Sequence, residues 1–301
     1  MLLRAFAAIS LIALIALPSA AVATGSKSSA PKASTATLLA AGDISDCSSP
    51  GAALTGRLIS HLPGTVAAVG DEAAPLGTLS EFKHCYAPTW GSFKARTNPT
   101  PGNHEYKLGN ANGYFAYFGA GAHPTGGYYS YSLGSWHIIV LNSNCQFIGG
   151  CDQGSAEMNW LQTDLAAHPN KCTLAYWHHA RFSEGPDTAA DPAAALAMQP
   201  FWATLVNAGA EILITGHDHM YQRFAPMDAS GNVDPAGMRE FVSGAGGRPF
   251  YNVVRHVAGI QKVITHHWGV LQLKLSSGGY SWKFLSAPSG KSLDSGSGSC
   301  H

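Results

Sequence analysis

The sequence EILITGHDHMYQ, at residues 211–222, changes character within a few residues. Its apolar, β-branched run is typical of a buried strand, and a glycine then leads directly into two histidines that flank an aspartate. Residues two apart in an extended segment point to the same side, so His217 and His219 can face one cavity while Asp218 points away. The segment predicts a strand that delivers imidazole ligands from its C-terminal end.

Other short apolar runs end in the same way, in Gly, Asp, Asn or His. With the first segment, these predicted strands occupy residues 38–44, 65–71, 136–144, 172–179 and 211–219. The patterns between them that are typical of helices are at residues 51–62, 155–168 and 192–208. The C-terminal third changes to short strands that are more typical of antiparallel pairing. We therefore expect an α/β (α+β) fold, with two sheets packed as a sandwich and helices outside.

Residues with nitrogen or oxygen ligand atoms gather in five loops, which we expect at the C-terminal ends of strands. These residues are Asp43, Asp71, Asn103, His104, His178, His217 and His219. Each alone is more often an ordinary turn or loop residue, but five such loops are hard to assemble by chance. Carboxylate, amide and imidazole ligands suit hard or borderline metal ions, and one carboxylate can bridge two ions. Enzymes that catalyse phosphoryl transfer commonly use two such ions.

The order of these motifs, GD, GD, GNHE, H and GHxH, resembles the calcineurin-like metallophosphoesterase superfamily. GNHEY and HDHMYQRF are most similar to the purple acid phosphatase branch and its small bacterial relatives. The resemblance covers about residues 37–287 and lacks the extra N-terminal β-domain of the large plant enzymes. It implies a phosphatase with two metal ions, which hydrolyses phosphate monoesters by attack of a metal-bound hydroxide. Two alternatives stay open: a phosphodiesterase or nucleotidase on the same site, and a catalytically weak, metal-holding cell-surface binding protein.

The resemblance also implies a role for each site residue. The implied ligands of the first metal ion are Asp43 and His219. Asp71 would bridge both ions. The implied ligands of the second ion, besides the bridge, are Asn103, His178 and His217. His104 would contact the phosphate and help to protonate the leaving oxygen. His179 is a candidate substrate-binding residue, although strand alternation predicts that its side chain points away from the metals.

Two positions of the first metal site depart from the family pattern. In the purple branch a tyrosine three residues after the bridging aspartate binds iron, and this chain has Ala74 there. In calcineurin-type members a histidine two residues after the first aspartate is a ligand, and here that residue is Ser45. Water, Ser45 or a residue from elsewhere must complete the site. The two ions can be zinc, manganese or iron, and iron is no longer favoured.

The N-terminal residues have the pattern of a secretory signal peptide. An apolar stretch at residues 5–17 follows Arg4 and precedes a small-residue cleavage site, which predicts a signal peptide at residues 1–23. A retained N-terminal anchor is the alternative reading. The remaining predicted parts are a flexible linker at 24–36, the catalytic domain at 37–287 and a flexible tail at 288–301. We expect a secreted or extracytoplasmic protein without a transmembrane segment in its mature chain.

The charge of the chain limits the kinds of partner that it can bind, and its cysteine content indicates the cellular compartment. Lys plus Arg and Asp plus Glu both total 18, so neither a basic face for nucleic acid nor an acidic tail is indicated. The expected partner is a small phosphorylated substrate, and the sequence does not indicate an oligomeric state. The six cysteines of an exported chain are expected to be bridged. Cys145 and Cys151 form a natural small loop around two glycines.

The other four cysteines allow three pairings. They are Cys47, Cys85, Cys172 and Cys300. We favour Cys47 with Cys85, because each follows closely on a predicted ligand loop.

Overall fold

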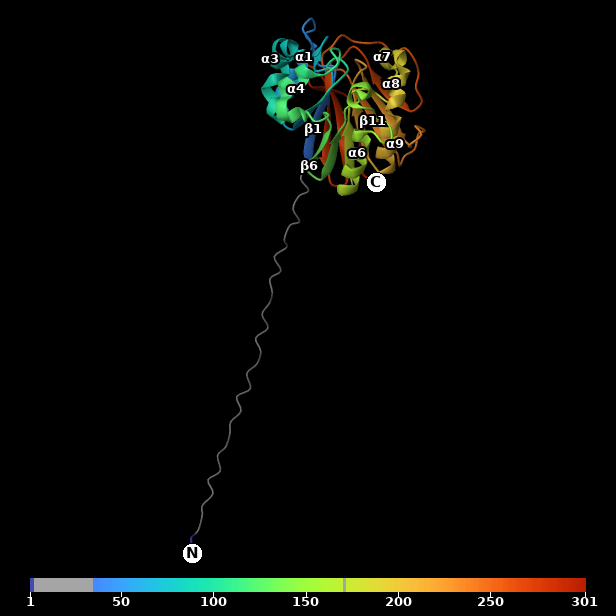
Figure 1. Ribbon diagram of the computed structural model, residues 1–301. Helices are drawn as coiled ribbons and strands as arrows, with labels where there is room; N and C mark the ends of the chain where they lie inside the picture. The colour runs from blue at the N-terminus through green and yellow to red at the C-terminus, as the bar shows by residue number, and fades with distance from the viewer. Residues whose placement is uncertain (3–34, 170–171) are drawn as a thin grey trace. The chain divides into compact units, whose positions relative to one another are not determined.

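Two β-sheets packed face to face, with helices on both outer faces, make up the body of the chain (Figure 1). The computed structural model describes residues 1–2, 35–169 and 172–301. Apart from residues 1–2 and 35–36, the predicted signal peptide and the predicted linker lie outside the described residues. The architecture confirms the predicted two-sheet sandwich.

The first sheet has six strands in the order β15-β14-β13-β1-β3-β5. Its strands are β1 (Ala36–Ala41), β3 (Thr65–Val69), β5 (Thr97–Thr100), β13 (Gly269–Ser276), β14 (Gly279–Ser286) and β15 (Lys291–Ser299). β1, β3 and β5 are parallel, whereas β13, β14 and β15 add on as an antiparallel meander.

The second sheet has seven strands in the order β12-β10-β11-β9-β8-β7-β6. Its strands are β6 (Tyr129–Leu133), β7 (Trp136–Val140), β8 (Cys172–Tyr176), β9 (Ile212–Thr215), β10 (Tyr221–Met227), β11 (Met238–Ser243) and β12 (Ile260–Ile264). The central strands β7, β8, β9 and β11 are parallel, and the outer strands are antiparallel. A small parallel pair joins β2 (Ser45–Asp46) to β4 (Ala73–Ala74).

Two groups of helices cover the sandwich. The helices over the first sheet are α1 (Gly51–Ser60), α2 (Leu79–Glu81), η1 (Phe82–Tyr86), α3 (Ala87–Trp90), η2 (Gly91–Arg96), α4 (Asn112–Phe118) and η3 (Gly119–Ala122). Those on the side of the second sheet are α5 (Cys145–Ile148), α6 (Ala156–Ala167), α7 (Pro186–Ala190), α8 (Pro192–Ala197) and α9 (Gln199–Asn207). None of the described helices is long and apolar enough to cross a bilayer.

The two-residue period of β1 explains why the sheet is buried on both faces. Leu38 and Ala40 belong to the core between the sheets, whereas Leu39 and Ala41 belong to the core under the first group of helices. Successive side chains of a strand point to opposite faces, so an unbroken apolar run serves two cores at once. This is why the predicted strands have continuous rather than alternating hydrophobicity.

Two predictions of the secondary structure were wrong in detail. The single helix expected at residues 192–208 is divided into α8 and α9 at Met198, because Pro200 occupies the first turn of a new helix, where its missing N–H is tolerated. The flexible tail expected at residues 288–301 contains β15, which pairs with β14 along its whole length. A Cβ on Gly296 would lie 2.3 Å from the Trp282 side chain, so the glycines of this strand make room for aromatic rings.

The six cysteines form three disulfides. The pairs are Cys47–Cys85, Cys145–Cys151 and Cys172–Cys300, and the described residues include no free cysteine. The predicted small-loop pair and the favoured Cys47 pairing are both confirmed. The third disulfide ties the C-terminal end of the chain to the start of β8.

We expect the native protein to have no reactive thiol, because all three pairs are formed in the fold. The measurement is the intact mass after thiol labelling under denaturing, non-reducing conditions. Any labelled cysteine in the native protein would contradict the all-paired assignment, and the reduced protein, which should take up six labels for its six cysteines, is the positive control.

Candidate metal centre

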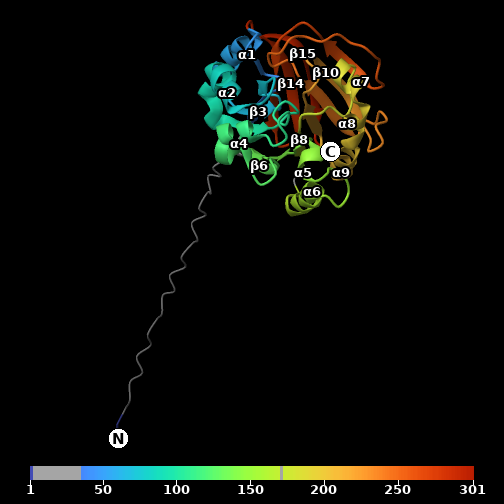
Figure 2. The same cartoon turned by 45° about the horizontal axis from the view of Figure 1, so that its top comes forward.

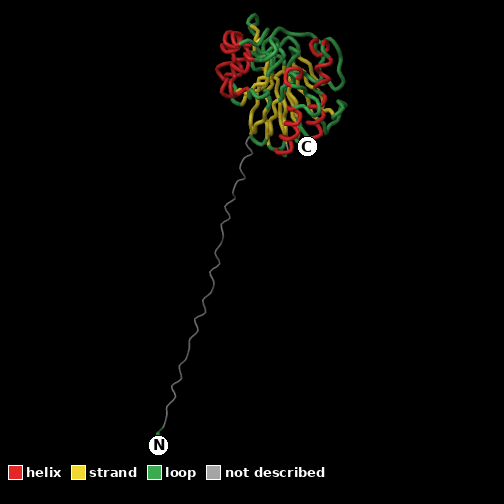
Figure 3. Tube along the Cα trace, viewed as in Figure 1, coloured by secondary structure: helices red, strands yellow, loops and turns green. Residues whose placement is uncertain are grey.

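The loops that carry the predicted ligands meet at one end of the strands. Loops gather at this end of both sheets (Figure 3), and the backbone ties the loops after β1, β3 and β9 to their neighbours. The Gly42 amide donates to Ser243 O at 2.9 Å, the Asp43 amide to Gly70 O at 3.0 Å and the Gly216 amide to His178 O at 2.9 Å. The two sheets therefore present their ligand loops to a common space.

Three of the predicted ligands have left-handed backbone conformations. The φ angles are 56° at Asp43, 52° at Asp71 and 73° at His217, and each residue follows a glycine at a strand end. Residues other than glycine seldom adopt this region, and such strain concentrates at functional sites. Here it turns each strand sharply as it ends, so that the side chain projects into the space between the loops.

Asp43 and His219 form the first half of the site. The distance from Asp43 Oδ1 to His219 Nε2 is 3.4 Å. His219 Nδ1 lies 2.8 Å from Pro249 O, which fixes the ring with its Nε2 atom toward the carboxylate. Both Asp43 Oδ1 and His219 Nε2 are buried and have no hydrogen-bond partner among the described residues.

The second half of the site contains Asp71, Asn103, His178 and His217. His178 Nε2 lies 3.4 Å from Asp71 Oδ1 and 3.0 Å from Asn103 Oδ1. His217 Nδ1 lies 3.1 Å from the same Asn103 oxygen. The ring of His178 is held by its other nitrogen, which lies 2.9 Å from Val69 O. The six predicted ligands therefore converge in two adjoining groups.

These side chains fit metal ions. A histidine whose Nδ1–H donates to a carbonyl oxygen presents the bare lone pair of Nε2, and this is the arrangement that metal-binding histidines adopt. The Nε2 atoms of His178 and His219 each face a carboxylate oxygen, a contact that is favourable only when a proton or a metal ion lies between the two atoms. Burial disfavours charge on His178, but the Asp71 carboxylate outweighs it and raises the pKa of His178 to about 10. The field of the two aspartates thus favours positive charge in this space.

The Asp218 side chain points away from the site, as predicted. Its Oδ2 accepts hydrogen bonds from the Ser183 and Thr188 hydroxyls at 2.6 and 2.5 Å, and its Oδ1 accepts from the Asp187 amide at 2.9 Å. The predicted reason was wrong, because β9 ends at Thr215 and the backbone at His217 is left-handed, not extended. Through these hydrogen bonds Asp218 holds the loop of His217 and His219 in place on the side that faces away from the site.

His104 stands at the rim of the site. Its Nδ1 lies 2.6 Å from Pro75 O, and its Nε2 lies 3.7 Å from Asp71 Oδ2. The side chain is 17% exposed, whereas those of the metal-facing Asp71 and His178 are 2% exposed or less. His104 can therefore reach both the site and a ligand that arrives from solvent.

His179 also lies at the site, contrary to the strand-alternation argument. β8 ends at Tyr176, so alternation no longer applies at His179, and its ring lies 4.7 Å from that of His217. Ser143 Oγ lies 2.8 Å from His179 Nδ1. Burial and then the neighbouring histidines lower the pKa of His179 well below its usual value, so the ring is neutral near pH 7.

Arg248 is a site residue that the sequence analysis missed. Its Nη1 lies 3.2 Å from Asp71 Oδ2, and its amide donates to Asp43 O at 3.0 Å. The preceding glycine run allows this approach, since a Cβ on Gly246 would lie 2.3 Å from Gly42 O. The glycine run directly before Arg248 was the available signal in the sequence.

Glu105 is a second residue to which no role was given, although it lies in the GNHE motif. Its carboxylate accepts hydrogen bonds from the amides of Asp71 at 2.9 Å, Ala73 at 3.1 Å and Gly102 at 2.7 Å. Burial, followed by the charge of Asp71, raises the pKa of Glu105 to about 7. Glu105 thereby holds the loop of the predicted bridging aspartate against the loop of Asn103.

The position of the missing tyrosine is filled by a residue that cannot bind metal. Ala74 is buried and has no donor atom in its side chain. Tyr251 stacks on the His219 ring at 3.9 Å, but its hydroxyl is turned to Asp187 Oδ2, 3.1 Å away. Tyr86 is fully buried in the core under the first group of helices. The Ser45 hydroxyl is buried without a hydrogen-bond partner among the described residues.

Comparisons with known proteins agree with this geometry. No protein-family model matches the sequence. The chain is 25% identical over 171 residues to probable purple acid phosphatase 20 of Arabidopsis thaliana, an alignment that covers 50% of this chain and 39% of that protein. The chain thus matches about two fifths of the length of that relative.

Two solved structures share the fold. Purple acid phosphatase PPD1 from yellow lupin (Lupinus luteus) seeds superposes with a TM-score of 0.70 at 16% identity, over 88% of this chain and 54% of that one. GAP50, the anchor in the inner membrane complex of Plasmodium, superposes with a TM-score of 0.68 at 13% identity, over 90% of each chain. These similarities show that the chain shares the fold of these two proteins.

Proposed function

We propose that this chain is an exported phosphoesterase with two metal ions that hydrolyses phosphate monoesters. The observation that carries the proposal is a pair of buried atoms, Asp43 Oδ1 and His219 Nε2, that have no hydrogen-bond partner in the described part of the chain and lie beside the second group of proposed ligands. Unsatisfied buried polar atoms are costly, and a metal ion would satisfy both. Export is supported by the three disulfides, which form in oxidising compartments.

The proposed ligands divide between the two ions as the family resemblance implies. Asp43 and His219 would bind the first ion, and Asp71 would bridge both ions. Those of the second ion are Asn103, His178 and His217. Bound there, the two ions would activate water and neutralise charge on the phosphoryl oxygens.

The protein's own contribution is to position charge and protons around phosphorus. Water adds its oxygen to phosphorus and releases one proton to solvent, the ester P–O bond breaks, and the alcohol leaves with a proton supplied by His104, which regains a proton from solvent. His104 suits this role because it is at the rim and its Nε2 faces the site. Neutral His179, held by Ser143, can donate a hydrogen bond to a phosphoryl oxygen.

Arg248 would bind the phosphate as a fixed cation. In this structure its guanidinium pairs with Asp71, the proposed bridge, and with bound metal the same donors would face a phosphoryl oxygen. Arg248→Met should weaken inhibition by inorganic phosphate by about 10- to 100-fold, the equivalent of about 1.5–3 kcal/mol for a hydrogen bond to a charged group. An unchanged inhibition constant would remove Arg248 from the phosphate site. Arg255→Met, whose guanidinium bonds Ser183 O outside the site, is the matched control and should leave inhibition unchanged.

The competing function is that of a catalytically weak, metal-holding binding protein at the cell surface. The absence of a donor at Ala74 and the unpaired Ser45 hydroxyl are the features that favour it. His104 favours catalysis, because a site that only holds metal has no use for an additional histidine at its rim.

Turnover of p-nitrophenyl phosphate beside its bis-substituted diester separates the three functions. We expect the monoester to be hydrolysed with the higher kcat/KM. Preference for the diester would identify a phosphodiesterase, and no turnover of either compound by metal-loaded protein would favour the binding protein.

Ala74 leads to a prediction about colour. The colour of the purple phosphatases arises from a tyrosinate bound to ferric iron, and Ala74 supplies no phenolate. Iron-loaded protein should therefore be colourless at high concentration, and its first site should exchange zinc or manganese readily. A visible absorption band that disappears in Tyr86→Phe would mean that Tyr86 has taken the vacant place.

A further inference from the structure

A cavity of about 280 Å³ opens beside the proposed second metal site. Asn103, one of the proposed ligands, and His179 line its inner end, so an ester whose phosphate occupies the metal centre would extend its alcohol part into this space. The cavity is slightly smaller than the sites of about 300–1,000 Å³ that enclose drug-sized ligands. It has room for a small alcohol.

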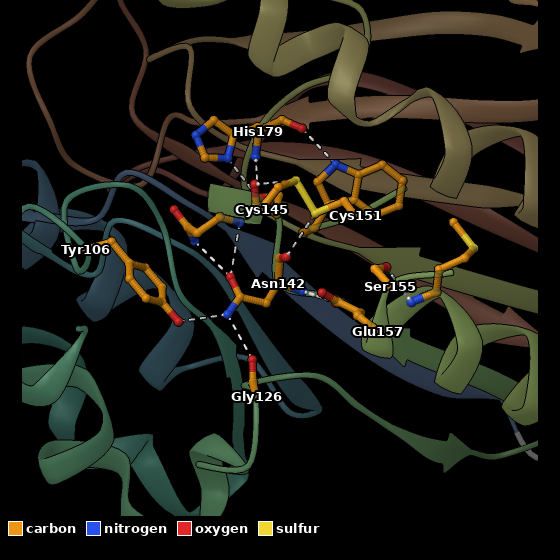
Figure 4. Close-up of a disulfide and its surroundings, with 12 residues drawn as sticks. Tyr106, Gly126, Asn142, Cys145, Cys151, Ser155, Glu157 and His179 are labelled. Carbon is orange, nitrogen blue, oxygen red and sulfur yellow. Dashed lines mark hydrogen bonds between the residues drawn. A yellow bond between two sulfur atoms is a disulfide. The ribbon is translucent and has the colours of Figure 1, made fainter. Parts of the chain in front are cut away.

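One wall of the cavity consists of residues 143–146, from the loop after β7 and the start of α5. The wall is rigid, because the Cys145–Cys151 disulfide closes it beside His179 (Figure 4). The Asn144 amide nitrogen donates to Pro101 O at 3.0 Å and to Asn142 Oδ1 at 2.9 Å. Both hydrogens of that amide are thus used, and its carbonyl oxygen is left to accept from a ligand.

A second wall is formed by α8 and the residue before it, and α8 lies near α5 and α7 in the rotated view (Figure 2). It contributes three small methyl groups, those of Ala193, Ala194 and Ala197, and the carboxylate of Asp191. Asp191 caps α8 by accepting the Ala194 amide at 3.0 Å, so its position is fixed. The lining therefore offers the Asn144 carbonyl oxygen and the Asp191 carboxylate as hydrogen-bond acceptors, with the polar side chains of Ser143 and Gln146 beside them, between short apolar surfaces.

The lining excludes two common classes of phosphate ester. Among the described residues that line the cavity there is no lysine or arginine to bind a second phosphate, and Asp191 would repel one. Apart from His179, none of these residues has an aromatic ring on which a nucleobase could stack. Acceptor groups instead suit the hydroxyl hydrogens of a neutral alcohol.

We infer, on the basis of the proposed function, that this cavity binds the alcohol part of the substrate and selects monophosphates of small, hydroxyl-rich alcohols of polyol or monosaccharide type. Asn144 and Asp191 accept hydrogen bonds from the hydroxyl groups, and the three alanines leave the space that the alcohol occupies. Nucleotides and polyphosphates are poor substrates for the same reasons.

The test compares glucose 6-phosphate, AMP and ATP as substrates of the metal-loaded protein, with p-nitrophenyl phosphate as the reference for the proposed function. We expect glucose 6-phosphate to have a kcat/KM about 10-fold or more above those of AMP and ATP, a ratio typical of one pocket's discrimination. AMP or ATP hydrolysis at least as efficient as that of glucose 6-phosphate would overturn the inference while p-nitrophenyl phosphate turnover still supports the function. Failure to hydrolyse p-nitrophenyl phosphate would overturn both.

A cavity-filling variant tests the location. Ala194→Phe should lower kcat/KM for glucose 6-phosphate by about 10-fold or more, because the ring occupies the alcohol's space. Inhibition by inorganic phosphate, which has no alcohol part, should be unchanged. Ala190→Phe, the same change at an exposed position of α7 that does not line the cavity, should alter neither quantity. Unchanged glucose 6-phosphate hydrolysis in Ala194→Phe would contradict the inference.

Discussion

Asp71→Asn is expected to abolish nearly all activity and to lower the metal content of the protein. The Asp71 carboxylate, the proposed bridge, has its Oδ1 3.4 Å from His178 Nε2 and its Oδ2 3.2 Å from Arg248 Nη1, and the variant replaces one of these oxygens with an NH2 group. The amide is neutral and its nitrogen cannot bind a cation, so one group would have to serve two ions with a single oxygen. The measurements are elemental analysis and p-nitrophenyl phosphate turnover. Two metal ions per chain in Asp71→Asn would contradict the bridging assignment.

Asp218→Asn is the matched control, since it makes the same chemical change directly between the proposed ligands His217 and His219. Asp218 faces away from the site and accepts hydrogen bonds from the Ser183 and Thr188 hydroxyls. This variant should keep both metal ions. Its melting temperature should fall, because the buried bonds that anchor the loop are weakened by about 1–3 kcal/mol in total.

His104→Ala should retain both metal ions and the fold but lower kcat by about 100-fold or more, the scale expected for a lost proton donor. The reason is geometric: the His104 side chain contacts Pro75 O and reaches toward Asp71, but it is not among the inward-facing ligand groups. Metal content and thermal stability are measured beside kcat. Loss of metal in this variant would make His104 a ligand rather than a proton donor.

His84→Ala serves as the control for His104→Ala. His84 is exposed, its ring contacts Ser80 on the same helical segment, and it has no contact with the proposed site. Its removal should leave kcat and metal content unchanged. A similar fall in kcat in both variants would point to a general effect of histidine removal and would contradict the specific role of His104.

Much of the site could be predicted from the sequence because its information is local. A glycine followed by aspartate or histidine after an apolar run identifies a strand end with a candidate ligand, as at Asp43 and Asp71, and parallel strands bring such ends together. The left-handed conformation of His217 was not predictable in this way, because it depends on contacts between loops from both sheets.

The features that were missed depend on distant contacts. Arg248 enters the site only because the glycines before it lie against the Gly42 loop, more than 200 residues earlier in the sequence. The strand at Lys291–Ser299 has the composition of a linker, and only the aromatic rings of β14 show why its glycines are suited to a sheet. The composition of a segment does not show which distant residues pack against it, and the structure of both of these segments depends on such residues.

The measurement that tests the central claim most directly is a metal titration of chelator-treated protein, followed by p-nitrophenyl phosphate turnover. If Asp71 bridges two ions, as proposed, activity should rise as zinc or manganese is added and reach its plateau at about two ions per chain. Activity that survives complete metal removal, or that reaches its plateau at about one ion per chain, would contradict a phosphoesterase with two metal ions.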